Sequence, residues 1–254
     1  MPTAVITGAS RGLGREIALA LATRHWGLVV DARSENALAT AARELVDAGA
    51  ESVAALPGSV ADPRHREAIA AAVGQRGELQ LLVNNASLLG PSPLPTLAEH
   101  PVDALEQVYA VNLVAPIALT QALLADLTRS GGRIVNISSD AAVEPYDHWG
   151  GYGSSKAGLD QATAILSAER PDLRVYALDP GDMRTQMHQE AFPGEDISDR
   201  PLPETVVPAV LALIDEDLPS GRYRAGDLLA NRPHPTRAAE AAEAAEAAGA
   251  EEGA

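Results

Sequence analysis

Tyr152 and Lys156 stand four residues apart in the stretch Tyr152-Gly-Ser-Ser-Lys156. In a helix, this spacing places the two side chains on one face, one turn apart. A phenol titrates near pH ~10 and is a poor proton donor at neutral pH. A neighbouring ammonium stabilises the phenolate and lowers the pKa of the phenol. The pair therefore has the chemistry of a general acid or base. Because many helices contain this spacing by chance, its meaning depends on the rest of the chain.

A glycine-rich turn, Thr7-Gly-Ala-Ser-Arg-Gly-Leu-Gly14, follows a strand-like run and precedes a helical pattern. This is the context of a dinucleotide-binding turn, in which a pyrophosphate sits on free N–H groups at a helix N-terminus. Gly8 permits the turn, Gly12 lets the backbone approach the pyrophosphate, and Gly14 allows close packing of helix on strand. The residues expected to bind the cofactor here are Gly8, Ser10, Arg11, Gly12, Leu13 and Gly14.

The end of the second predicted strand indicates which dinucleotide binds. NAD-binding proteins usually carry an acid there to hold the ribose 2′-hydroxyl, but the corresponding residue is Ala32, followed by Arg33. Arg33 and Arg11 favour a 2′-phosphate, so the expected cofactor is NADP(H). Asp31 leaves an alternative open. Strand alternation turns it away from the side of Ala32, but if it faces the ribose, NAD is the cofactor.

Short apolar runs alternate with helical patterns, which predicts βαβ units. The predicted fold is α/β, a Rossmann-type doubly wound parallel sheet of about seven strands in a three-layer αβα sandwich. The expected strands are 3–7, 28–32, 52–57, 79–83, 133–137, 173–178 and a weaker one at 222–229. The expected helices are 13–23, 35–48, 63–75, 102–128 with a bend near Pro116, 151–169 and 203–215. Residues 1–231 are expected to form a single dinucleotide-binding and catalytic domain. An Ala/Glu-rich tail, 232–254, is expected to be disordered or a frayed helix.

The composition of the 254 residues excludes several classes of function. The chain has no cysteine, which excludes disulfides and thiolate chemistry, and its six His show no metal-ligand spacing, so no metal site is expected. A net charge of −16 argues against nucleic acid or an anionic membrane as partner. No apolar run reaches the ~18 residues of a membrane span. The first strand begins at Thr3, which leaves no room for a signal peptide, so a cytoplasmic location is expected.

Further motifs occur in a fixed order along the chain. They are Asn84-Asn85-Ala86-Ser87, Asn112 in Val-Asn-Leu, Ile137-Ser138-Ser139, and Pro180-Gly181 with Thr185. Together with the turn at 7–14 and the pair Tyr152-x-x-x-Lys156, the chain resembles the short-chain dehydrogenase/reductase family over about residues 3–185.

The resemblance implies catalytic roles for Asn112, Ser139, Tyr152 and Lys156. Tyr152 would exchange a proton with the carbonyl or alcohol oxygen, while Lys156 would lower its pKa and hold the nicotinamide ribose. Ser139 would bind the substrate oxygen, with Ser138 as its rival, and Asn112 would hold a water that links Lys156 to solvent. The implied cofactor-binding residues beyond the turn are Arg33, Ser59, Val60, Asn85, Ala86, Tyr152, Lys156, Pro180, Gly181 and Thr185.

Three segments, 87–95, 140–151 and 182–203, are expected to surround the substrate. Within the last segment, residues 192–203 are expected to form a mobile lid. The expected substrate-binding residues are Ser87, Ser139, Glu144, Trp149, Met183 and Met187. Mixed charged and aromatic groups in these segments favour a polar or mid-sized carbonyl compound. A homo-oligomer, dimer or tetramer, is expected. The family's usual Asp-Gly-Gly after the last strand is missing, however, which puts the oligomeric state in doubt.

The expected function is that of an NADP(H)-dependent oxidoreductase that transfers a hydride between the nicotinamide and a carbonyl or secondary alcohol, as a ketoreductase does. Two alternatives remain. A sugar or nucleotide-sugar epimerase or dehydratase uses a similar Tyr–Lys pair, but usually needs a longer C-terminal substrate domain. A non-catalytic dinucleotide sensor usually lacks Tyr or Lys, and this chain has both.

Overall fold

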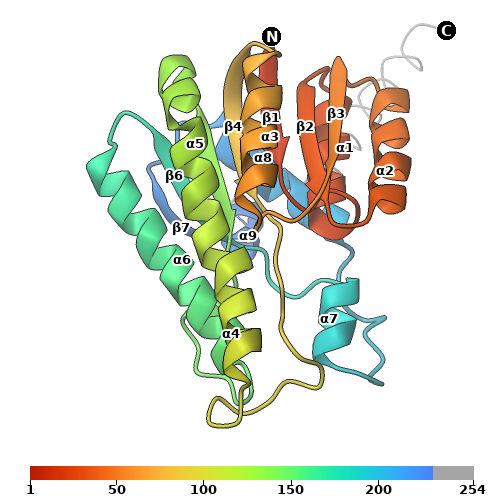
Figure 1. Ribbon diagram of the computed structural model, residues 1–254, viewed down its shortest axis with the longest axis vertical. Helices are drawn as coiled ribbons and strands as arrows, with labels where there is room; N and C mark the ends of the chain where they lie inside the picture. Colours follow the sequence, from red (N-terminus) through yellow and green to blue (C-terminus); the bar gives the residue numbers. More distant parts are fainter. Residues whose placement is uncertain (231–254) are drawn as a thin grey trace, which may run out of the picture.

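In the computed structural model, which describes residues 1–230, seven parallel strands form one sheet in the order β3-β2-β1-β4-β5-β6-β7 (Figure 1). The predicted tail, 232–254, lies outside the described residues. The strands are β1 (Pro2–Ile6), β2 (Gly27–Ala32), β3 (Ser52–Pro57), β4 (Glu78–Asn84), β5 (Arg133–Ile137), β6 (Arg174–Asp179) and β7 (Gly221–Arg224). The α-helices are α1 (Gly12–Ala22), α2 (Glu35–Asp47), α3 (Pro63–Gly74), α4 (Val102–Tyr109), α5 (Ala115–Ser130), α6 (Gly150–Glu169), α7 (Gln186–Ala191), α8 (Val207–Asp215) and α9 (Ala225–Ala230).

Helices cover both faces of the sheet, as Figure 1 shows. On one face, α1, α2 and α8 pack their apolar residues, among them Ile17 and Leu213, against strand residues such as Ile6. On the other face, α3 and α5 pack against residues that include Val5. Val5 and Ile6 point to opposite faces because side chains alternate along a strand. The predicted doubly wound αβα sandwich is therefore confirmed.

The strand order reverses between β1 and β4, the two central neighbours. In open parallel sheets, ligands bind outside the carboxyl ends of the strands at such a reversal. The glycine-rich turn follows β1, the Asn85-Ala86 segment follows β4, and Ser138-Ser139 follows β5. The fold thus brings the predicted site residues to one edge of the sheet.

The chain after β6 differs from the prediction in two places. Within the expected loop 182–203, α7 forms a short helix whose N-cap, Thr185, accepts a hydrogen bond from the His188 amide. The last strand ends at Arg224, not near residue 229, and the chain continues as α9. Leu228 and Leu229 of this helix pack against the core on the side of α8, a burial that an extended strand would not provide.

A single long helical stretch, 102–130, includes α4, the π-helical turn η1 (Ala110–Val114) and α5. The disturbance falls just before Pro116, as predicted, because proline has no N–H to donate and clashes with the preceding turn. By length and composition alone, this helix could cross a membrane, which corrects the expectation that no segment qualifies. The core helix of a soluble protein passes the same test, and Leu119 and Leu123 here pack in the core of the sheet.

Candidate active site

A cleft of about 1380 Å³ lies along the carboxyl edge of the sheet. Its lining includes Arg33 after β2, the glycine-rich turn after β1, and Tyr152 of α6. The side of α7 completes the wall with residues such as Met187. Residues that are distant in the sequence therefore share one continuous cavity.

The glycine-rich turn packs directly on the segment that follows β4. Gly8 has a φ of 69°, and a Cβ there would lie 2.9 Å from the Cα of Ala86. A Cβ on Gly14 would lie only 2.4 Å from Asn85 Nδ2, which donates a hydrogen bond to Thr7 O at 2.8 Å. Gly14 is buried behind the turn and does not line the cleft, which fits the packing role predicted for it.

The Asp31 side chain makes its contacts within the protein. Its Oδ1 accepts a hydrogen bond from the Gly8 amide at 2.7 Å, and its Oδ2 lies 3.0 Å from His65 Nε2. The Asp31 residue is only 2% exposed. Both carboxylate oxygens thus have partners within the protein, which favours the interpretation that Asp31 is not the ribose-binding acid of an NAD site.

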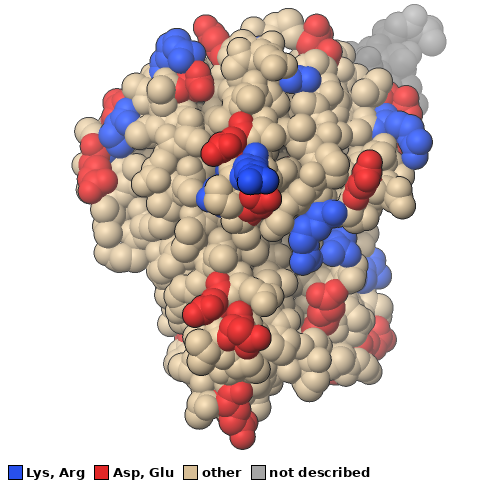
Figure 2. Space-filling view, in the orientation of Figure 1, with Lys and Arg blue, Asp and Glu red and all other residues tan. Residues whose placement is uncertain are grey.

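Basic side chains mark the end of the cleft near β2. Arg33 is exposed and lines the cleft beside Ser34, while the neighbouring Ala32 is buried. Arg11 also lines the cleft, and its guanidinium donates to the side chain of Gln186 in α7. Figure 2 shows Lys and Arg side chains gathered between α2 and α7. This end of the cleft therefore suits an anionic group.

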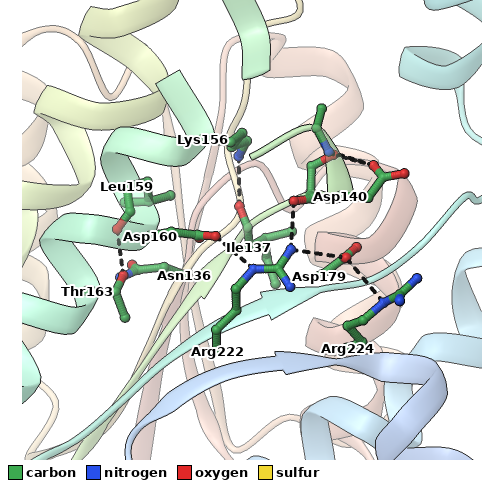
Figure 3. Close-up of polar contacts among 12 residues, drawn as sticks. Asn136, Ile137, Asp140, Lys156, Leu159, Asp160, Thr163, Asp179, Arg222 and Arg224 are labelled. Atoms are coloured by element: carbon green, nitrogen blue, oxygen red, sulfur yellow. Dashed lines mark hydrogen bonds and ion pairs between the residues drawn. The ribbon is translucent and has the colours of Figure 1, made fainter. Parts of the chain in front are cut away.

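Helix α6 carries Tyr152 and Lys156 one turn apart, and both line the cleft. Lys156 Nζ lies 5.5 Å from the centre of the Tyr152 ring and donates a hydrogen bond to Ile137 O at 2.7 Å (Figure 3). Gly153, between them, lets the helix approach the 3-10 turn Asp140–Ala142 that follows β5, because a Cβ there would lie 2.5 Å from Ala141 O.

The pKa values of Tyr152 and Lys156 are shifted in opposite directions from the ordinary values of a phenol and an amine. Burial raises the pKa of Tyr152 to about 12, although the hydroxyls of Ser87 and Ser139 lower it. Burial also lowers the pKa of Lys156 to about 8, against the opposing effect of Asp160. The expected lowering of the Tyr152 pKa by Lys156 is thus not seen, because burial disfavours the charged form of both groups.

Ser139, not Ser138, contributes the hydroxyl that influences Tyr152. The Ser139 hydroxyl donates to Asp140 Oδ1 at 2.9 Å, and Tyr146 donates to the other oxygen of this carboxylate at 3.0 Å. The Ser138 side chain is buried, and its hydroxyl has no partner among the described residues. Both serines line the cleft, and the effect of the Ser139 hydroxyl on the pKa of Tyr152 favours Ser139 as the substrate-binding serine.

Asn112 is fully buried in the π-turn, away from the cleft. Its side chain bonds both backbone groups of Leu88, accepting from the amide at 2.8 Å and donating to the carbonyl at 2.9 Å. It also donates to Ser155 Oγ at 3.0 Å. The side chain therefore joins the segment after β4 to α6, while the predicted role in holding a water stays a prediction.

Most of the other predicted residues line the cleft, with two exceptions. Glu144 is exposed and outside the cleft, because the turn that begins at Asp140 directs it to solvent. Ser59 does not line the cleft either, since its hydroxyl accepts from the Ala61 amide within its own turn. Those that line the cleft are Gly8, Ser10, Arg11, Gly12, Leu13, Arg33, Val60, Asn85, Ala86, Ser87, Ser139, Trp149, Tyr152, Lys156, Pro180, Gly181, Met183, Thr185 and Met187.

Acidic residues that the sequence interpretation missed also line the cleft. They are Glu16, Asp140, Asp147, Asp179, Asp182 and Glu190. Asp140 could have been found from its position directly after Ser139, but the others depend on how the chain folds. Within residues 1–230, no group of three or more His, Asp or Glu is placed to hold a metal ion.

The parallel sheet and the glycine-rich turn at its carboxyl edge are the arrangement of a dinucleotide-binding α/β protein, and the buried Tyr–Lys pair lies in the same cleft. The family model described as short chain dehydrogenase matches residues 2–196. The chain belongs to this family of oxidoreductases.

Four similar proteins illustrate the range of the family. A sepiapterin reductase from Xenopus laevis is 34% identical over 74% of this chain and 75% of its own length. A benzil reductase of Bacillus subtilis, (S)-benzoin forming, is 31% identical over 72% and 75%. The structure of an alcohol dehydrogenase from Thermococcus sibiricus, complexed with 5-hydroxy-NADP, has a TM-score of 0.79 at 30% identity and covers 88% of this chain and 95% of its own. A short chain dehydrogenase from Escherichia coli CFT073 complexed with NADPH has a TM-score of 0.81 at 28% identity, over 88% and 96%.

Proposed function

We propose that this protein is an NADP(H)-dependent ketoreductase that reduces a carbonyl group to a secondary alcohol. The observation that carries the proposal is the position of Tyr152, whose phenol shares one cleft with the glycine-rich turn. With a pKa of about 12, Tyr152 is protonated at neutral pH. A protonated phenol is the form that can donate to a carbonyl oxygen, which favours reduction as the direction.

The described residues fit a phosphorylated dinucleotide. The turn around Gly8 and Gly12 has positive φ values of 69° and 57° and leaves its backbone open to the cleft. Arg33 and Arg11 would hold the 2′-phosphate, as guanidinium groups do well. NADP-complexed and NADPH-complexed structures among the similar proteins support the same cofactor. Asn85, Ala86 and the Pro180-Gly181 turn would line the rest of its path.

The proposed chemistry divides between the cofactor and three side chains. NADPH, when bound, supplies the hydride. Tyr152 donates its phenolic proton to the substrate oxygen, and Ser139 binds that oxygen by turning its hydroxyl away from Asp140. The Lys156 ammonium stabilises the phenolate that is left behind. Each of these groups lines the cleft.

Carboxylates at the substrate end favour an uncharged or cationic carbonyl compound. Asp140, Asp147 and Asp182 line this part of the cleft with Trp149 and Phe192. A substrate carboxylate would meet these like charges, which cost free energy in a partly buried site. Aromatic side chains supply apolar contact area. We therefore infer a mid-sized neutral ketone or diketone rather than a keto acid.

The test is turnover. The protein is incubated with NADPH and a panel that contains sepiapterin, benzil, simple ketones, aldehydes, quinones and keto acids, and cofactor oxidation is followed optically. We expect neutral dicarbonyl compounds to react fastest and Tyr152→Phe to react at a small fraction of that rate. Cofactor binding with no turnover of any carbonyl would overturn the proposal in favour of a dinucleotide sensor.

We also propose a homo-oligomer, in the cytoplasm, built from one domain over residues 1–231. All seven described strands share one sheet, which supports the single domain. Apolar side chains are exposed on neighbouring helices, with Val102, Val114 and Ile117 along α4 to α5 and Ile165 on α6. We take these exposed apolar side chains as the contact face of the proposed oligomer. Light scattering that gives the mass of a single chain of 26.3 kDa would contradict this.

A further inference from the structure

Behind the floor of the cleft, Arg222 of β7 reaches three other elements (Figure 3). Its Nη2 donates a hydrogen bond to the backbone carbonyl oxygen of Ser139 at 2.9 Å. Its Nε pairs with Asp160 Oδ2 of α6 at 2.8 Å. Nη2 also pairs with Asp179 Oδ2, at the end of β6, at 3.2 Å. One guanidinium therefore joins the ends of β5 and β6 to the helix that carries the Tyr–Lys pair.

Each contact lies next to a group at the proposed site. Ser139 is itself the proposed substrate-binding serine, so Arg222 holds its backbone while its hydroxyl faces the cleft. Asp160 follows Lys156 by one helical turn and opposes the lowering of its pKa. Asp179 precedes Pro180, and its Oδ1 accepts a hydrogen bond from the Gly181 amide at 3.0 Å.

The two carboxylates depend on this arginine for charge compensation. The side chains of Asp160 and Asp179 are only 14% and 4% exposed, and Asp160 Oδ1 has no hydrogen-bond partner among the described residues. Arg224 adds a longer contact of 3.8 Å to Asp179 from a side chain that is 66% exposed. Removing one partner of a buried ion pair leaves an uncompensated charge, which is costly. Only a planar guanidinium presents several donors in fixed directions to acceptors on three elements.

Arg222 does not line the cleft. It therefore cannot contact the substrate, and its effect on the reaction must pass through the groups that it holds. We propose that Arg222 is a positioning residue that keeps Ser139, Lys156 and the Pro180-Gly181 turn in their working arrangement from behind the cleft. The expected effect of Arg222 on turnover rests on the proposed reductase function. The ion pairs of Arg222 with Asp160 and Asp179 can be tested without turnover.

The first experiment uses a peculiarity of the sequence. Lys156 is the only lysine among the 254 residues. Protein labelled with ¹³C at the lysine ε-carbon therefore gives one resonance, and its pH titration in the cofactor-free protein reports Lys156 directly. Besides Asp160 and Arg222, the charged groups in this network are Asp179 and Arg224. The other titratable group at Lys156 is the phenol of Tyr152, whose ring centre lies 5.5 Å from Nζ and whose pKa of about 12 keeps it protonated through the titration.

Changes of opposite charge should move this titration in opposite directions. Arg222→Met removes a cation and leaves Asp160 uncompensated, so the midpoint should rise by about 0.5–1 pH unit. Asp160→Asn removes the anion, so the midpoint should fall. Arg174→Met is the matched control. Arg174 lies on β6, the strand next to β7, and pairs with the 78% exposed Asp217, so its loss should leave the midpoint unchanged.

The second experiment measures turnover by the same variants. Arg222→Met should lower kcat by about 10–100-fold, because small displacements of reacting groups are costly. Its Kd for NADPH should rise by a smaller factor than kcat falls, because Arg33 and the glycine-rich turn would still hold the other end of the cofactor. Arg174→Met should keep the wild-type kcat. If Arg222→Met does not fold, Arg222→Gln and Asp160→Asn take its place.

The outcomes separate the two proposals. Unchanged kcat in a folded Arg222 variant, or a lysine titration that moves in neither variant, would overturn the positioning role. A wild-type protein that reduces no carbonyl would contradict the proposed function, and in that case the lysine titration decides the Arg222 network by itself.

Discussion

Lys156 Nζ donates a hydrogen bond to the carbonyl oxygen of Ile137 over 2.7 Å. This bond links α6 to the end of β5, two residues before Ser139, so the helix that carries Tyr152 and the proposed substrate-binding serine are held together. The ammonium is buried at 2% exposure, and burial lowers its pKa from 10.5 to about 8, with Asp160 opposing this effect. The charge of Lys156 is therefore sensitive to pH near neutrality.

We expect reduction to slow as the pH rises through about 8. Above this value Lys156 loses its proton, and the phenolate formed when Tyr152 donates its own proton loses a stabilising charge. The pKa of Tyr152 is about 12, so its phenol stays protonated over this range and causes no further loss of activity. The measurement is kcat/KM from pH 6 to 10. Lys156→Arg should be slower but should lack the decline, since a guanidinium keeps its charge throughout. If kcat/KM of Lys156→Arg declined with the same midpoint as the wild type, the titrating group would be a residue other than Lys156.

Replacing Tyr152 by Phe should lower kcat by about 10²–10⁴-fold, because the phenolic proton is lost while the ring stays in place. The Kd for NADPH should change little. Tyr109→Phe is the control, because Tyr109 lies outside the cleft. Equal turnover by Tyr152→Phe and wild type would mean that another acid protonates the substrate.

The sequence was sufficient to predict the sheet, most of its helices and the place of the Tyr–Lys pair. The periodicity of apolar residues indicates which residues are buried. The sheet lies between two layers of helices and is the most buried part of this fold. The end of the chain was harder: the residues after Arg224 were predicted as strand, but Leu228 and Leu229 bury themselves by forming a helix beside α8. Whether these residues form a helix depends on packing against α8, and a local sequence pattern contains no information about that neighbour.

The site residues divide in the same way. The family resemblance predicted that Tyr152 and Ser139 lie together, and both residues line one cleft. It did not show that burial, rather than the neighbouring ammonium, dominates the pKa of Tyr152, because burial is a property of the assembled fold. Glu144 was wrongly placed at the substrate, since the direction of a loop side chain is set by turns such as the one at Asp140. The contacts of Arg222 connect residues up to 83 positions apart and have no signal in the sequence.

Arg33→Ala should weaken NADPH binding by about 10–100-fold, the effect of losing a hydrogen bond to a charged group, and leave NADH binding nearly unchanged. Arg33 is exposed at the cleft, with no acid at the neighbouring Ala32. Fluorescence titration with NADPH and with NADH measures the ratio of the two Kd values. Arg43→Ala serves as control, because its side chain contacts Thr40 on the exposed face of α2. Tighter binding of NADH than of NADPH by the wild-type protein would contradict the cofactor assignment.

Gly14→Ala should lower the free energy of unfolding by about 1–3 kcal/mol, as overpacking does. The added Cβ would lie 2.4 Å from Asn85 Nδ2 and 2.7 Å from Gly8 O, so the turn must shift and NADPH binding should weaken as well. Denaturant unfolding measures the change. Gly74→Ala is the matched control at the end of α3, where a Cβ meets nothing within 4 Å, so its stability should be equal or slightly higher. Equal stability of both variants would show that the turn has room that the structure does not indicate.

Asp31→Ala should destabilise the protein without changing its choice of cofactor. The substitution leaves the Gly8 amide and His65 without their carboxylate partner in a buried place, at a cost of about 2–4 kcal/mol in the free energy of unfolding. Asp31→Asn keeps an oxygen for the Gly8 amide, so it should lose less. Asp217→Ala, which removes an exposed surface pair, should lose under about 1 kcal/mol. Because Asp31 serves the turn rather than a ribose, both cofactors should weaken together when the turn loosens, and the ratio of their Kd values should be unchanged. A selective loss of NADH binding would instead identify Asp31 as a ribose ligand and return NAD as a cofactor.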